Sequence, residues 1–226
     1  MQKQNQNENN VIGEKINDFL QKNRKIIYIS AGAIVLIIVG CVVTLSLVDM
    51  SRSKAISELE ELSNRYEALR YSINEEYMEG EVNDLLTELG NFSSRKSGYT
   101  GAKASLLIGN IHSEKKEWAE AEESWIRAAE KAAKTHLAPV AWFNAGIAAE
   151  QLGKTEKAID HYAKSLSAVA GFSGASRAQF SIGRLRETLN EKEAAIAAYR
   201  AVISGWPYDS VWTSLAHSRI IILELQ

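Results

Sequence analysis

The sequence predicts an all-α protein in which one membrane-spanning helix precedes an array of helical hairpins. An uncharged apolar run lies near the N-terminus, and small and aromatic residues recur at a fixed spacing through the C-terminal half. Only two prolines, Pro139 and Pro207, occur in 226 residues, which favours long uninterrupted helices. This length suits one membrane segment and one domain of ordinary size.

Composition argues against several classes of function. With 26 basic and 28 acidic side chains, the net charge of −2 gives no basic face for nucleic acid. One cysteine, Cys41, is too few for an intramolecular disulfide or a cysteine-based metal cluster. Neither a phosphate-binding loop nor a GxSxG motif occurs, and none of the histidines has metal-ligand spacing. We expect a protein that is not an enzyme and has no cofactor, metal or small-molecule substrate. The histidines are His112, His136, His161 and His217.

The N-terminal part predicts a membrane anchor. Residues 26–48 contain no charge, and 23 helical residues span about 35 Å, enough for a bilayer core. Residues 1–25 begin with many Asn and Gln, so they are predicted to be a disordered cytoplasmic segment. Lys22, Arg24 and Lys25 precede the apolar run, which favours a cytoplasmic N-terminus and a large domain on the other side.

A lipoprotein is the alternative to a spanning helix. Residues 38–41 read Ile-Val-Gly-Cys and resemble a lipobox, in which Cys41 is acylated and the preceding residues are removed. The chain stays apolar from Val42 to Val48, where a lipoprotein normally turns polar. A retained membrane helix is therefore the preferred interpretation.

Residues 51–226 are predicted to form the helical domain, starting with a degenerate hairpin over residues 51–90. Leu59, Leu62, Tyr66 and Leu69 step by three and four, as on one face of a helix. A second, shorter amphipathic helix follows Gly80. The same stripe also fits a short coiled-coil seam. A polar loop over residues 91–101 is expected to precede the first full repeat.

Three units of the C-terminal half share one register. Their glycines lie 37 residues apart, with Ala twelve residues after each glycine and an aromatic residue sixteen after it. The matching residues are Gly109, Ala121 and Trp125; Gly146, Ala158 and Tyr162; and Gly183, Ala195 and Tyr199. Agreement at several positions in three units indicates a structural repeat.

Packing explains this spacing. Gly153 and Asn190 lie between two helical segments and are residue types that end helices in the left-handed conformation. Each unit is thus predicted to be a helix, a tight turn and an antiparallel second helix. The repeated glycine is expected where the two helices cross, with the Ala facing it and the aromatic ring filling the adjoining space.

This pattern resembles the tetratricopeptide repeat. Residues 141–166, AWFNAGIAAEQLGKTEKAIDHYAKSL, read like the family consensus, and Pro207 lies at the place of its terminal proline. The period of 37 exceeds the usual length of about 34, and Glu122 replaces an aliphatic residue. The resemblance implies a right-handed superhelix with repeats at 102–138, 139–175 and 176–208 and a capping helix at 209–226.

Stacked hairpins of this kind curve, and their first helices line the concave face. We expect that face to bind a short peptide, in part through apolar side chains, unless these are buried between units. Its expected residues are Lys103, Leu106, Asn110, Val140, Phe143, Asn144, Ile147, Arg177, Phe180, Arg184, Thr213 and His217.

Some proteins of the family bind a C-terminal carboxylate through two Asn and three basic residues. Asn110, Asn144 and Arg177 match three of these places, whereas Leu106 and Ser181 replace two cations. Losing two charge-assisted contacts makes carboxylate capture the weaker hypothesis.

The layout as a whole resembles the YfgM-type ancillary subunits of the bacterial secretion translocon, and residues 98–106 resemble that family's entry into its first repeat. The resemblance implies an inner-membrane protein with a periplasmic domain that hands emerging chains from the secretion channel to chaperones. The alternative is an envelope-assembly scaffold of the outer-membrane or pilus type, which would fit a lipoprotein acylated at Cys41. A cytoplasmic-facing adaptor requires the opposite topology.

Overall fold

The computed structural model describes residues 2–70, 75–168 and 172–225, and over these residues its regular structure is entirely helical. The predicted all-α class is confirmed. The chain divides into two compact units, Met1–Lys54 and Ala55–Gln226.

Helix α1 runs from Gln2 to Arg70. The chain is already helical at Gln2, whereas the composition of residues 1–25 predicts disorder. No proline precedes Pro139, so no residue in this stretch lacks the backbone N–H that a helix needs.

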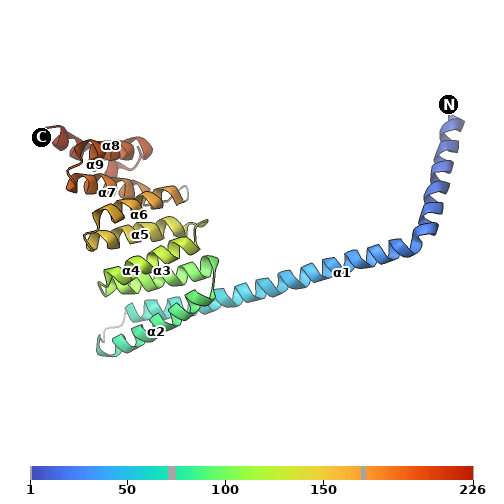
Figure 1. The fold of residues 1–226 in the computed structure, drawn as a ribbon, viewed down its shortest axis with the longest axis horizontal. Coiled ribbons are helices and arrows are strands. Elements are labelled where there is room, and N and C mark those ends of the chain that lie inside the picture. Colours follow the sequence, from blue (N-terminus) through green and yellow to red (C-terminus); the bar gives the residue numbers. More distant parts are fainter. Residues whose placement is uncertain (1, 71–74, 169–171, 226) are drawn as a thin grey trace. The chain divides into compact units, whose positions relative to one another are not determined.

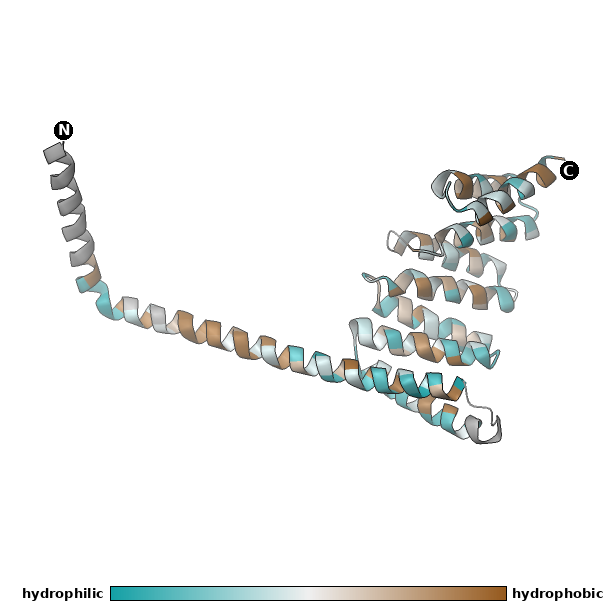
Figure 2. Ribbon diagram, turned by 180° about the vertical axis from the view of Figure 1, so that it is seen from behind, coloured by the Kyte–Doolittle hydropathy of each residue, from teal (hydrophilic) through white to brown (hydrophobic). Residues whose placement is uncertain are grey.

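The apolar run of α1 packs against nothing in its own unit. Side chains from Ile34 to Val48 are exposed throughout, including Leu36 at 73%, and Figure 2 shows the run as a brown stretch of the long helix. Thr44 Oγ1 donates a hydrogen bond to the Gly40 carbonyl at 2.8 Å, so this polar side chain is satisfied within the helix. Among the described residues, α1 is the one helix long and apolar enough to cross a membrane, judged by length and composition.

The second unit is a stack of antiparallel hairpins (Figure 1). After the end of α1, the helices are α2 (Glu75–Arg95), α3 (Gly98–Glu114), α4 (Trp118–Lys131), α5 (Leu137–Gln151), α6 (Thr155–Ala168), α7 (Ala175–Thr188), α8 (Lys192–Gly205) and α9 (Ser210–Glu224). Helices α3 and α4, α5 and α6, and α7 and α8 pair within hairpins, and each hairpin packs on the next. This is the tetratricopeptide-like arrangement predicted from the sequence.

One backbone conformation ends the first helix in each of the three hairpins α3–α4, α5–α6 and α7–α8. Lys116, Gly153 and Asn190 have φ of 60°, 69° and 59°, and they too lie 37 residues apart. The N–H after each of them bonds to a carbonyl five residues earlier, as Lys154 N does to Ala149 O at 2.9 Å. This is the Schellman arrangement. Gly153 and Asn190 were expected here; Lys116 shows that the register forces the turn even on a residue that disfavours it.

The expected N-terminal hairpin is present, with different limits. Leu59 and Leu62 of α1 pack in one buried cluster with Leu85, Leu89 and Phe92 of α2. Helix α2 begins before Gly80 and continues to Arg95, and α3 begins at Gly98, so only residues 96 and 97 of the predicted loop are not helical. Within that segment Ser93 is buried and its hydroxyl lies 2.7 Å from Ser105 Oγ, so a polar side chain that suggested a surface loop is satisfied inside.

Candidate functional site

Each of the three repeat glycines lies against an aromatic ring on the second helix of its own hairpin. A Cβ added to Gly109 would lie 2.5 Å from Trp125 Cδ1. The corresponding distances are 2.7 Å from Gly146 to Tyr162 Cε1 and 2.6 Å from Gly183 to Tyr199 Cε1. The contact is with the ring rather than with the Ala one turn earlier, although Ala121, Ala158 and Ala195 are fully buried nearby. The ring thus sets how closely the two helices of a hairpin approach.

In the second and third repeats, the tyrosine that contacts the glycine also donates a hydrogen bond to a glutamate. Tyr162 OH on α6 donates to Glu150 Oε1 on α5 at 2.6 Å, and Arg184 on α7 pairs with the other carboxylate oxygen. Burial, followed by the hydrogen bond to Glu150, raises the pKa of the Tyr162 hydroxyl far above its usual value. One carboxylate therefore joins three helices and two consecutive repeats.

The same arrangement recurs one repeat later. Tyr199 OH on α8 donates to Glu187 on α7, and Arg219 on α9 donates to the same carboxylate, its Nε at 3.0 Å. Burial alone would raise the pKa of Glu187, but the bonds from Arg219 and Tyr199 outweigh it and lower that pKa. The signal in the sequence is a Glu four residues after the repeat glycine, with Tyr at sixteen, and sequence reasoning did not use it.

The first repeat departs from this scheme. Its aromatic residue is Trp125, whose indole N–H donates to Asn110 Oδ1 at 3.0 Å. Asn110 therefore has a structural partner inside its own hairpin. The bond occupies only the amide oxygen, so the Nδ2 hydrogens that a carboxylate would accept are not used by it.

Glu122, the departure from the family consensus, connects the first two repeats. This α4 side chain is 8% exposed, and its carboxylate lies 2.7 Å from Lys154 Nζ and 3.2 Å from His161 Nε2. Desolvation by itself would raise the pKa of Glu122, yet the bonds from Lys154 and His161 outweigh it and lower the pKa. Trp142 covers the imidazole, its ring stacked on His161 at 5.5 Å.

Of the expected apolar groove residues, Phe143 is buried and Leu106, Ile147 and Phe180 are half-buried. Phe143 is buried, with its ring 5.3 Å from that of Tyr162 and 5.7 Å from that of Phe172. Phe180 lies 5.1 Å from Tyr199 and 5.2 Å from Trp212, ring to ring. Ile147 packs beside the Phe143 cluster, and Leu106 packs beside the cluster of Ala121 and Trp125. These side chains thus contribute to packing within and between repeats, and the peptide groove stays a prediction.

The polar members of the expected groove remain accessible to different degrees. Arg177, Arg184 and His217 are exposed, whereas Lys103, Val140, Asn144 and Thr213 are half-buried. The Arg177 guanidinium lies 5.2 Å from the Phe143 ring centre, so the buried ring supports an exposed cation. Thr213 Oγ1 donates to the Asp209 carbonyl at 2.8 Å. The first-helix residues thus offer a polar, partly basic face above an aromatic layer.

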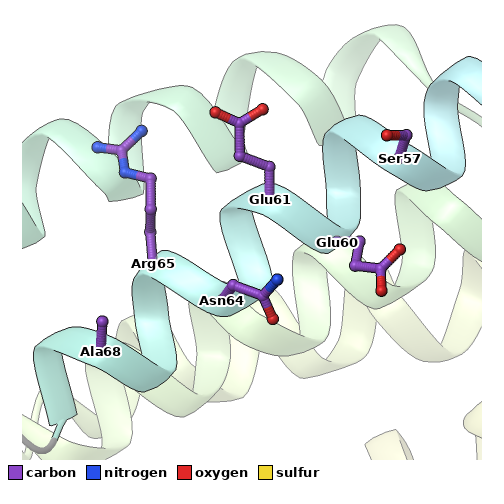
Figure 3. Close-up of a pocket in the computed structure, with 6 residues that line it drawn as sticks. All are labelled: Ser57, Glu60, Glu61, Asn64, Arg65 and Ala68. Atoms are coloured by element: carbon purple, nitrogen blue, oxygen red, sulfur yellow. The ribbon is translucent and has the colours of Figure 1, made fainter.

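No enclosed catalytic centre stands out in the part of the chain that the structure describes. Within the described ranges no group of three or more His, Cys, Asp and Glu is placed to hold a metal. The depression in Figure 3 is lined by Ser57, Glu60, Glu61, Asn64, Arg65 and Ala68, all from α1, so it is the polar outer surface of one helix.

The comparisons with known proteins agree with this geometry. Residues 106–171 and 145–210 match the tetratricopeptide repeat family model. This part of the chain is therefore similar to tetratricopeptide repeats, which suggests a protein–protein interaction module.

One further protein and two solved structures are also similar to this chain. A TPR repeat-containing protein of Treponema pallidum (strain Nichols) is 27% identical over 232 residues, covering 93% of this chain and 94% of that protein. Among solved structures, the apo form of RapI aligns with a TM-score of 0.53 at 14% identity, over 73% of this chain and 46% of RapI. MamA aligns with a TM-score of 0.45 at 24% identity, over 54% of this chain and 67% of MamA. The likeness to RapI extends to the fold alone.

Proposed function

We propose that this protein is a membrane-held, non-enzymatic binding module for protein segments, serving protein secretion or chaperone hand-off. The observation that carries the proposal is the polar face of the repeat array. Lys103, Asn144 and Arg177 lie on its first helices α3, α5 and α7, half-buried or exposed, and the Arg177 guanidinium lies over the Phe143 ring.

These three side chains are suited to hold a peptide. Among the described residues, none of them makes an ion pair or a side-chain hydrogen bond, in contrast to Arg184, which is paired with Glu150. Lys and Arg donate to backbone carbonyls and carboxylates, and an Asn amide both donates and accepts. An extended segment with acidic side chains is the ligand that this set of groups fits best.

The proposed location is a bacterial inner membrane, with a cytoplasmic N-terminus and a periplasmic domain. The apolar part of α1 supports an anchor because its exposed side chains have no partner in their own unit. Lys22, Arg24 and Lys25 support the orientation. A topology reporter fused at Gln226 tests it: periplasmic activity is expected, and cytoplasmic activity would indicate a cytoplasmic adaptor.

The proposed partners are the secretion channel and periplasmic chaperones, on the strength of the resemblance to YfgM-type proteins. An envelope-assembly scaffold acylated at Cys41 is the second candidate, because that thiol is exposed and follows a lipobox-like sequence. Labelling with radioactive palmitate distinguishes the two, since only the lipoprotein incorporates the label. Replacing Cys41 with Ser provides the control.

Photocrosslinking tests the binding face. A photoreactive amino acid at position 144 or 177 should yield discrete adducts in intact membranes, including channel subunits or chaperones. The control position is Lys157, an exposed residue of the second helix α6. Equal adducts at 157, or none at 144 and 177, would count against binding on this face.

A further inference from the structure

Helix α9 has apolar side chains on two opposite faces. On the inner face, Ala216, Ile220 and Leu223 are buried in one cluster with Tyr199 and Val202 of α8. This face holds α9 on the array. It accounts for only three of the eight apolar residues of the helix.

The outer face carries a second apolar stripe. Val211 is 60% exposed, Leu215 44%, Ile222 42% and Leu225 83%. Their spacing of four, seven and three residues puts them along one side of the helix, opposite the buried side. A helix that is apolar on both faces is normally covered on both.

The stripe contains no charge. The two ionised residues of α9 are engaged with the rest of the chain: Arg219 pairs with Glu187, and Glu224 pairs with Arg200 at 3.0 Å. Without flanking Lys or Arg on its outer side, the helix lacks the features of one that lies on an anionic membrane surface.

The opposite end of the array is built differently. There the outer face of α1 presents Ser57, Glu60, Glu61, Asn64 and Arg65, as Figure 3 shows. Repeat arrays need a polar outer face where they end in water. The outer face of α1 is polar, whereas the outer face of α9 is apolar. The α9 face is therefore the better candidate for contact with a partner.

We propose that this partner is a second copy of the chain, paired antiparallel through α9. The stripe is nearly symmetric about Ser218: in an antiparallel pair Val211 faces the second Leu225, and Leu215 faces the second Ile222. Ser218 then lies at the two-fold axis, where a small residue lets two helices approach. Because no charge lies on the stripe, the two-fold arrangement brings no like charges together.

The size of the stripe predicts a weak pair. It consists of four partly exposed apolar side chains, whereas a standard interface buries roughly 800 Å² per partner and about 20–30 residues a side. Confining both copies to one membrane would raise their effective concentration. The pairing goes beyond the proposed peptide binding, which uses different residues.

Cysteine crosslinking on the full-length chain in membranes tests the geometry. In a Cys41→Ser background, Ser218→Cys should give disulfide-linked dimers under mild oxidation. Chains carrying Val211→Cys alone and Leu225→Cys alone should crosslink efficiently only when mixed. A dimer from Val211→Cys by itself, or no dimer from Ser218→Cys, would overturn the antiparallel pair.

Introducing charge on the stripe tests its energetics. Leu215→Glu combined with Ile222→Glu should weaken dimerisation of the full-length chain in detergent at least about tenfold, measured by analytical ultracentrifugation. Ser57→Glu, on the polar face of α1, should leave it unchanged. Both target residues are exposed, and helicity by circular dichroism verifies folding. Unaltered dimerisation in the double variant, or a wild-type chain that stays monomeric, would refute the proposal.

Discussion

Gly146 illustrates how a single missing side chain fixes the geometry of a hairpin. Its Cα faces the ring of Tyr162 so closely that a Cβ would lie 2.7 Å from Cε1 and 2.8 Å from Cδ1. The ring cannot retreat easily, because its hydroxyl is bonded to Glu150 and Phe143 packs on its side. Glycine has a low helix propensity, but at this position it allows the two helices to cross closely, which offsets that cost.

We therefore expect Gly146→Ala to destabilise the array. Overpacking should outweigh the gain of about 1 kcal/mol in helix propensity, leaving a net loss of about 1–2 kcal/mol in the free energy of unfolding. Urea unfolding of the full-length chain in mild detergent measures it.

Gly90→Ala is the matched control for this substitution. Gly90 also lies within a helix, α2, but no atom lies within 4 Å of its added Cβ. Alanine should stabilise this site by up to about 1 kcal/mol. An equal response at the two glycines would contradict the role assigned to the ring contact.

Ionisation of Glu122 makes the free energy of unfolding of the array depend on pH. Its folded-state pKa lies below the ordinary value of 4.5 because Lys154 and His161 bind the carboxylate. Folding thus favours the ionised form. The stabilisation is present above about pH 4.5 and is lost as pH falls through the lower folded-state pKa.

Glu122→Gln should accordingly lower the free energy of unfolding at neutral pH, with the wild-type and variant curves converging below about pH 4.5. Urea unfolding across a pH series measures the gap. Glu130→Gln is the control, since Glu130 is exposed and makes no ion pair among the described residues. A gap at Glu122 that stayed constant with pH would show that charge on this residue is not what stabilises the contact.

At the scale of helices, one glutamate joins α7, α8 and α9. Glu187 is only 14% exposed and receives bonds from both Tyr199 and Arg219. The other link between α8 and α9, from Arg200 to Glu224, has side chains 66% and 51% exposed. Bonds to a charged group in a partly buried site contribute more than exposed pairs, which are screened by water.

Tyr199→Phe should cost about 1–3 kcal/mol, because Glu187 loses a donor in a site that water does not easily enter. Arg200→Ala, which breaks the exposed link between the same two helices, should cost less than about 1 kcal/mol. Hydrogen exchange should show faster exchange of α9 amides in the tyrosine variant. If Arg200→Ala loosened α9 more than Tyr199→Phe did, the buried link would not be the stronger one.

The helices themselves were largely predictable, because Gly, Ala and aromatic residues at fixed spacing report backbone packing directly. The contacts between repeats were not. Phe143 and Phe180 recur on the first helices and fit a groove as well as a core, and only the positions of Tyr162 and Tyr199 decide between these. Likewise, Glu122 departs from the consensus, but its partners lie more than thirty residues away in the next repeat.

For the whole molecule, the division at Lys54 and Ala55 predicts that the array folds without the apolar segment. The α1 residues beyond this point still belong to the array, because Leu59, Leu62 and Tyr66 are buried there. Removing them would expose Leu85 and the other buried side chains of α2 to water.

A chain beginning at Ala55 should be helical and unfold cooperatively. A chain beginning at Glu75 should lose several kcal/mol of stability, since large apolar contacts are removed from a packed core. Circular dichroism during thermal unfolding compares the two. Equal midpoints would show that the hairpin is not part of the cooperative unit.

The tryptophans give the array its own optical readout. All five lie beyond Lys54, so tryptophan fluorescence reports on the helical array and not on the apolar segment. Trp125 lies in the first repeat, Trp142 in the second against His161, and Trp212 against Phe180 at the far end. Variants that keep a single tryptophan would therefore report the unfolding of each repeat separately. They would show whether the repeats unfold together in one step or successively from one end.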